Sequence, residues 1–209
     1  MRKALVVQGG WQGHEPGPVS EILVEALRKN GVDVTVSDTL DSFKDEALMQ
    51  SLSLVVPIWT MGDISGDQLK PLLEAVKNGC GIAGVHGGMG DAFRQQTEFQ
   101  YMVGGQWVAH PGGAGMTYKV HLLDPWHPLT QGIDDFEITS EQYYMHVDPA
   151  NCVHATTMFG YTAMPVIWTK SYGKGRVYYC SLGHVAENVR MPQVLELVTR
   201  GMMWAAAGK

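Results

Sequence analysis

The sequence predicts an α/β protein in which a mostly parallel sheet carries helices on both faces, followed by a β-rich second half. Up to residue 90, short apolar segments alternate with amphipathic helical segments. This order favours parallel strands connected by helices. The segment Leu52–Trp59 is apolar almost throughout, as is typical of a strand buried on both faces. After residue 115 the chain consists of short segments rich in tyrosine, valine and threonine, which favour strands.

The first half supplies these strands and helices in turn. Leu5–Val7 is the first strand, and the glycine- and proline-rich loop 8–18 separates it from a helix that stops at Asn30-Gly31. The helix carries an apolar stripe made of Val19, Ile22, Leu23, Ala26 and Leu27. The expected elements that follow are a strand at 32–37, a short helix at 44–50, the strand at 52–59, a helix at 65–79 and a strand at 81–86. We expect Pro71 in the first turn of the helix at 65–79, where a missing N–H is tolerated.

The second half is predicted as a series of short strands closed by one helix. The strands are expected at 116–124, 135–140, 142–149, 152–159, 164–170 and 175–184. The segment KSYGKG between the last two is typical of a hairpin turn. A helix at about 188–206 closes the chain. Because the sequence shows no linker, low-complexity tract or repeat, we expect a single domain over 1–209.

Composition and charge argue against several classes of function. The net charge of -6 gives no reason to expect a nucleic-acid or membrane partner. No apolar run approaches the roughly 18 residues that span a bilayer, and Ala4–Val7 is too short for a signal peptide. The 3 cysteines are widely spaced and form no CxxC pair. They indicate a reducing compartment, and hence a cytoplasmic location.

The stretch GVHGG places a histidine where a catalytic turn is expected. A strand that ends at one reactive residue, followed by glycines and a helix, has the layout of a nucleophile elbow. Here the residue is His86, and the helix is expected to open at Asp91. Histidine can act as an acid or base near neutral pH or as a metal ligand. The alternative is a histidine that only hydrogen-bonds its loop.

Further candidates lie at other strand ends. His184 follows the last strand, and the nearby Glu187 is either its carboxylate partner or a helix cap. Glu141 opens the polar-aromatic segment EQYYMH, whose alternative reading is an exposed edge strand. We therefore predict His86, His184 and Glu141 as catalytic residues. The predicted substrate-binding residues are His14, Trp59, Tyr144 and His146. The remaining histidines are expected to be structural: His110, His121, His127 and His154.

A divalent metal, zinc or manganese, is a possible cofactor, with His86, His184 and Glu141 as its ligands. These residue types suit such an ion, but their wide spacing in the sequence gives only weak support, since no HExxH or CxxC motif occurs. The glycine-rich stretches match neither nucleotide-binding fingerprint, so no nucleotide cofactor is predicted. The absence of GxSxG argues against a serine hydrolase.

Three stretches together resemble the ThuA-like (trehalose utilisation) family: GVHGG, DPWHPLTQGIDDFEITSEQYYMH and PVIWTKSYGKGRVYYCSLGH. The resemblance implies a three-layer, flavodoxin-like fold of the class I glutamine amidotransferase type. In true amidotransferases the elbow residue is a cysteine, and here it is His86, so glutamine hydrolysis through a thioester is excluded. Cys80 lies at the other end of the predicted strand and cannot replace it.

The resemblance also implies a role in the catabolism of trehalose and related disaccharides, including 3-keto derivatives. A histidine base could remove the proton beside a keto group, and elimination, hydrolysis and isomerisation stay open. The alternative is a non-catalytic protein that binds a sugar or a partner. Relatives often carry Asp-Glu where this chain has Ser140-Glu141. A small carbohydrate is the expected ligand, and family analogy suggests a homodimer.

Overall fold

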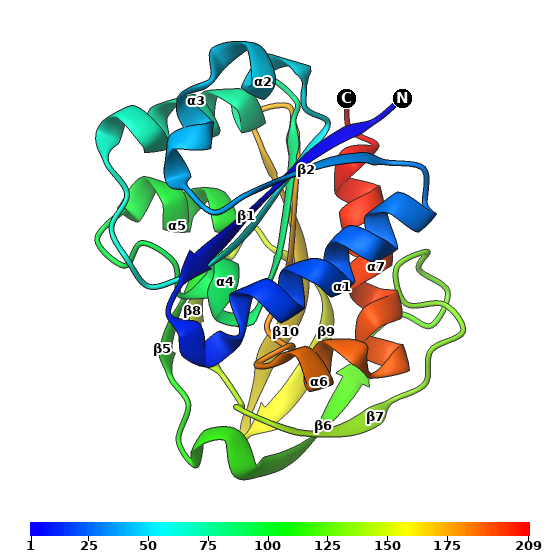
Figure 1. Cartoon of the computed structure of the whole chain (residues 1–209). Helices are drawn as coiled ribbons and strands as arrows, with labels where there is room; N and C mark the ends of the chain where they lie inside the picture. Colours follow the sequence, from blue (N-terminus) through cyan, green and yellow to red (C-terminus); the bar gives the residue numbers. More distant parts are fainter.

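The computed structural model describes residues 1–209 and is built around one nine-stranded sheet of order β2-β1-β3-β4-β11-β10-β9-β6-β7 (Figure 1). One side of the sheet is parallel. It consists of β1 (Lys3–Gly10), β2 (Asp33–Ser37), β3 (Leu54–Thr60), β4 (Gly81–Val85) and β11 (Gly175–Cys180). The other side is antiparallel. It consists of β6 (Met116–Leu122), β7 (Phe136–Ser140), β9 (Cys152–Phe159) and β10 (Thr162–Tyr172).

Helices cover both faces of the sheet and form two separate cores, so the predicted three-layer α/β fold is confirmed (Figure 1). One face carries α1 (Pro16–Lys29), α6 (Ala186–Arg190) and α7 (Pro192–Ala206). The other carries α2 (Glu46–Ser51), α3 (Gly66–Lys77) and α5 (Thr97–Val103). Successive residues of β1 point to opposite cores: Val6 packs under α1 and Val7 under α3. A strand between two helical layers must be apolar on both faces, which explains the continuous apolar runs.

The remaining elements are short and lie near the carboxyl ends of the parallel strands. The helix α4 (His86–Gly90) follows β4 directly, and the 3-10 helix η1 (Gln12–His14) follows β1. A small antiparallel pair joins β5 (Gly105–Ala109) to β8 (Tyr144–Val147). Two further 3-10 helices are η2 (Leu40–Lys44) and η3 (Gly113–Gly115). None of the helices combines the length and the apolar character that a membrane-spanning helix requires.

Three local predictions are wrong. The helix after β4 begins at His86, and Asp91 is its C-cap instead of its start. Pro71 lies inside α3, because Ser65 and Gln68 form a capping box that fixes the helix start at Gly66. The last helix is divided into α6 and α7, with Pro192 opening α7. Proline at a first helical position is favourable, so the break falls just before it.

Candidate functional site

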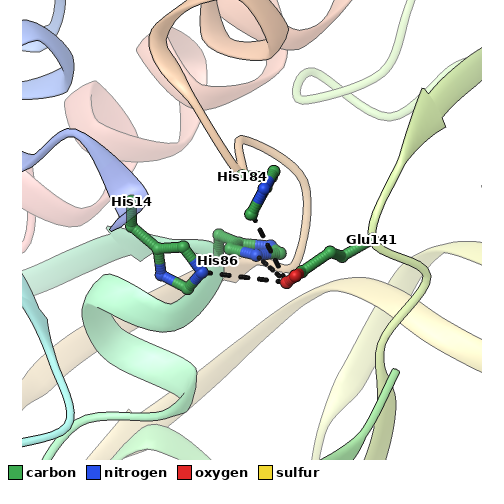
Figure 2. A group of neighbouring side chains, drawn as sticks. All are labelled: His14, His86, Glu141 and His184. Atoms are coloured by element: carbon green, nitrogen blue, oxygen red, sulfur yellow. Dashed lines mark hydrogen bonds and ion pairs between the residues drawn. The ribbon is translucent and has the colours of Figure 1, made fainter. Parts of the chain in front are cut away.

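Four side chains converge beyond the carboxyl ends of the parallel strands: His14, His86, Glu141 and His184. Figure 2 shows the three imidazoles around the carboxylate, and four of their ligand atoms lie within 4.8 Å of one another. His14 comes from η1, His86 opens α4, and His184 lies in the loop after β11. Glu141 follows β7, on the antiparallel side of the sheet. Ligands of open α/β sheets bind at this edge, so the fold brings together residues that are far apart in sequence.

The turn at His86 has a strained backbone. His86 has a φ of 46°, a left-handed conformation that non-glycine residues adopt only when the surrounding structure enforces it. Gly87 follows at a position where a Cβ atom would lie 2.7 Å from the imidazole of His14. Glycine is therefore required for the two imidazoles to approach. The ring centroids of His14 and His86 are 4.7 Å apart.

The hydrogen bonds of His86 fix its neutral tautomer. Nδ1 lies 2.8 Å from the backbone carbonyl of Ser181, and because a carbonyl only accepts, Nδ1 must donate. In the neutral ring Nε2 then carries a lone pair, which faces Oε2 of Glu141 at 3.1 Å. Burial lowers the pKa of His86 to about 4, although the hydrogen bond to Glu141 opposes this. In its neutral form His86 would point a lone pair at a carboxylate oxygen, whereas in its protonated form Nε2 would donate to that oxygen.

The carboxylate of Glu141 is shared by three imidazoles. Oε2 lies 3.7 Å from Nε2 of His14 and 3.4 Å from Nδ1 of His184, in addition to its contact with His86. Burial alone would raise the pKa of Glu141, but the contacts with His14, His184 and His86 hold it well below its usual range. The phenol of Tyr118 donates to the backbone carbonyl of Glu141 at 3.1 Å and fixes this segment. Glu141 is therefore an ionised acceptor at neutral pH.

The donor set suits a divalent metal ion. The buried Nδ1 of His184 has no hydrogen-bond partner, and Nδ1 of His14 is held by the hydroxyl of Thr60 at 2.8 Å. Such outer hydrogen bonds orient metal-binding imidazoles. Tetrahedral zinc with bonds of about 2.1 Å separates its ligands by about 3.4 Å. The distances from Oε2 to the three imidazoles, 3.1, 3.4 and 3.7 Å, bracket that value. This buried group could hold a metal.

The structure gathers only some of the predicted site residues. His86, His184, Glu141 and His14 meet, whereas the predicted substrate-binding residues Trp59, Tyr144 and His146 do not join them. The Trp59 ring lies across Gly9 and Gly62. Tyr144 packs against Phe159, and His146 is exposed.

The neighbouring Tyr143 occupies the place that the prediction gave to Tyr144. Its ring is buried and stacks on His86 with the centroids 3.9 Å apart. The alternation of side chains along this segment puts Tyr143 and Tyr144 on opposite faces, and the inward face belongs to Tyr143.

The carboxylate beside His184 is Glu141, not Glu187. Glu187 is exposed in the first turn of α6. The N-terminus of that helix is capped by Asn188, whose Oδ1 accepts from the N–H of Val185. Oε2 of Glu15 accepts from the N–H of Ala186 at 2.9 Å.

Two further residues near the site were missed in the sequence. His110, expected to be structural, has Nδ1 3.8 Å from Oε1 of Glu141 and a side chain 37% exposed. It follows β5, a strand that sequence reasoning did not predict, so no signal placed it. Trp11 packs against His14 with ring centroids 4.7 Å apart. Its position in the loop after the first strand was the available signal, because His14 in the same loop was already predicted to bind substrate.

The fold is a three-layer α/β sheet, and its strand–turn–helix elbow after β4 carries His86 at the turn. The trehalose utilisation family, ThuA, matches residues 3–205, and the chain belongs to this family. A search of the curated proteins finds no match.

Solved structures show the same fold. A ThuA-like protein from Parabacteroides merdae aligns with a TM-score of 0.78 and 21% identity, over 100% of this chain and 91% of that one. A second, from Bacteroides uniformis, aligns with a TM-score of 0.79 and 16% identity, over 98% and 91%. A β-galactosidase from Bacillus circulans matches 99% of this chain with 30% of its own length, at a TM-score of 0.61 and 14% identity. At these identities the likeness concerns the fold alone.

Proposed function

We propose that this protein is a metal-dependent enzyme of carbohydrate catabolism that acts on a keto derivative of a disaccharide or glycoside. Membership of the trehalose utilisation family supports a carbohydrate-related role. The observation that carries the proposal is the convergence of three imidazoles on Oε2 of Glu141. Nε2 of His86 lies 3.1 Å from Oε2 of Glu141, and a divalent cation bound by both atoms would satisfy the lone pairs that they direct at each other when the imidazole is neutral.

Burial of these ionisable groups favours an enzyme over a binding scaffold. His14, His86 and Glu141 are each less than a tenth exposed. Burying polar and charged groups costs free energy, and perturbed groups of this kind cluster at functional sites. A protein that only held a sugar would have no need of a carboxylate enclosed by histidines. The arrangement therefore supports chemistry more than simple recognition.

The metal ligands would be Nε2 of His14, Nε2 of His86, Nδ1 of His184 and Oε2 of Glu141. The donor set of imidazoles with one carboxylate suits zinc and also manganese. Such an ion supplies Lewis acidity, which polarises a carbonyl or lowers the pKa of a bound water. The hydrogen bond that Nδ1 of His86 donates to the backbone carbonyl of Ser181, and the hydrogen bond between Nδ1 of His14 and the hydroxyl of Thr60, would set the orientation of two ligands.

Proton transfer would fall to His110, the imidazole near the site that is not among the metal ligands. The lowered pKa values make His86 and Glu141 weak bases, which suits ligand roles. The His110 side chain is 37% exposed, and its Nδ1 lies 3.8 Å from Oε1 of Glu141. A keto group acidifies the neighbouring C–H bond, so an imidazole beside the substrate can remove that proton. Elimination and isomerisation of a keto-sugar both begin with this step.

The test is the metal content of the purified protein, measured by mass spectrometry beside two variants. We expect near-stoichiometric zinc or manganese in the wild type, and its loss in His86→Ala. The matched control is His154→Ala, which removes another buried histidine away from the site and should keep the metal. A wild type that takes up neither ion on reconstitution would refute the metal centre. Hydrogen exchange beside the carbonyl of 3-keto-trehalose, followed by NMR in D₂O, then tests the chemistry.

A further inference from the structure

We propose that the indole of Trp11 forms a stacking subsite for one sugar ring of a disaccharide, beside the histidine–glutamate site. The inference rests on the proposed carbohydrate function and extends it to a substrate-contact residue. The backbone N–H of Trp11 donates to the carbonyl of Thr60 at 3.0 Å. The hydroxyl of the same Thr60 holds His14 at 2.8 Å. The end of β3 therefore positions both the indole and one of the four central residues.

The indole is held on one side by the protein. Its ring meets the imidazole of His14 at an interplanar angle of 70°, with centroids 4.7 Å apart. A Cβ atom at Gly13 would overlap the six-membered ring of Trp11, so glycine lets the indole rest directly on the backbone. Despite these contacts Trp11 remains 46% exposed. A large, positioned aromatic surface is thus left open beside a buried polar site.

Exposure alone does not single out Trp11, because Trp126 is 86% exposed. The two tryptophans differ in how the indole is packed and in where it lies relative to the site. Trp126 lies in the loop between β6 and β7, where its backbone N–H donates to the side chain of Asp124. No other aromatic ring lies against its indole. The Trp11 ring instead packs directly on His14 of the central group. Trp126 therefore provides a matched control for an exposed tryptophan away from the site.

A pyranose ring fits this surface chemically. One face of the ring presents C–H groups, which pack on an aromatic plane, while its hydroxyls remain free for polar partners. Small-molecule sites combine such apolar walls with a few placed polar groups. With one sugar unit at the four central residues, the second unit of a disaccharide would extend over Trp11. His110, also partly exposed near Glu141, would lie beside the first unit.

Binding of trehalose to the metal-loaded protein tests the subsite. Trehalose has no keto group and therefore serves as a non-reacting probe in calorimetry and in tryptophan fluorescence. We expect Trp11→Ala to weaken binding by about ten-fold or more, as for aromatic anchors at other interfaces. Trp11→Phe should retain most of the affinity but lose the fluorescence change on binding. Trp126→Ala should match the wild type in both trehalose affinity and the fluorescence change. Trp11→Ala should weaken the binding of glucose less than the binding of trehalose.

The outcomes separate this inference from the proposed function. Metal content is measured for each variant, so a Trp11→Ala protein that keeps its metal still has an assembled site. Equal trehalose affinity in that variant and in the wild type would overturn the subsite and leave the metal centre standing. A metal-loaded wild type that binds no trehalose would overturn both the disaccharide assignment and the subsite. A wild type without metal would refute the metal centre itself.

Discussion

Two groups of histidines lie inside this protein, one beyond the parallel strands and one among the antiparallel strands. The first is the group of His14, His86 and His184 around Glu141. The second is the pair of His127 and His154, whose ring centroids are 4.4 Å apart. Each group contains a histidine bonded to a threonine hydroxyl at the same distance, 2.8 Å, to Thr60 in the first and Thr169 in the second.

The two groups differ in whether a carboxylate lies among the imidazoles. Glu141 lies within 3.7 Å of all three imidazoles in the first group. Neither His127 nor His154 forms an ion pair with any acidic residue, and His127 accepts a bond from the backbone N–H of Leu129. Closely packed imidazoles alone are therefore compatible with an ordinary core. What marks a site is the buried anion, which needs positive charge near it.

Removal of that anion should have the largest effect. Glu141→Gln keeps the size of the side chain but removes its charge and one ligand oxygen. Loss of an outer hydrogen bond to a metal ligand already costs about 10–100-fold in affinity, so loss of a ligand should exceed about 100-fold. Metal titration with a competing chelator measures this. His154→Gln, the equivalent change in the second group, should leave metal affinity as in the wild type. Equal metal affinity in Glu141→Gln and the wild type would contradict the role of the carboxylate as the feature that separates the two groups.

Much of the fold was predictable from the sequence, because burial on both faces leaves a continuous apolar pattern. Leu54–Thr60 and Gly81–Val85 are strands as expected, and the hairpin turn lies between β10 and β11. The segments Thr97–Val103 and Gly105–Ala109 were missed. Both are short; α5 buries only part of its residues and no residue of β5 is fully buried, so their apolar patterns are weak.

The site was predictable where a polar residue lies at a strand end or in the loop that follows it, as His14, His86, Glu141 and His184 do. His86 and His184 follow neighbouring parallel strands, and that rule found them. Tyr143 and His110 lie on irregular segments near β8 and β5, where a shift of one position exchanges the inward and outward faces. Their approach to His86 and Glu141 depends on tertiary packing, which spacing in the sequence does not encode.

The threonine–histidine hydrogen bond of each group gives a second comparison, in which the expected change in metal affinity is smaller than for Glu141→Gln. Thr60→Val removes the hydroxyl that orients His14, and metal affinity should fall by about 10–100-fold. Thr169→Val makes the same change beside His154 and should leave metal affinity unaltered. It should instead lower the free energy of unfolding by about 1 kcal/mol, the usual value of one hydrogen bond. Chelator competition and urea unfolding on both variants measure the two quantities. An equal loss of metal affinity in both variants would contradict the assignment of the metal to the first group alone.

The smallest expected effect is the pH dependence that the second group gives to stability. Burial lowers the pKa of His154 from 6.5 to about 4, nearby His127 lowers it further, and Asp124 opposes the shift. The unfolded chain therefore takes up the proton first as the pH falls. The free energy of unfolding should be highest above the unfolded pKa and decrease from there toward the folded value.

Between about pH 7 and about pH 5 the loss attributable to His154 should be on the order of 2 kcal/mol. In His154→Gln this component is absent, so its unfolding free energy should fall less than that of the wild type. His86 also has a lowered pKa, but it is present in both proteins and cancels in the difference. Urea unfolding of the metal-free proteins at both pH values provides the measurement. If the two proteins lose stability in parallel, His154 is protonated as readily in the folded as in the unfolded chain, and its burial does not keep it neutral.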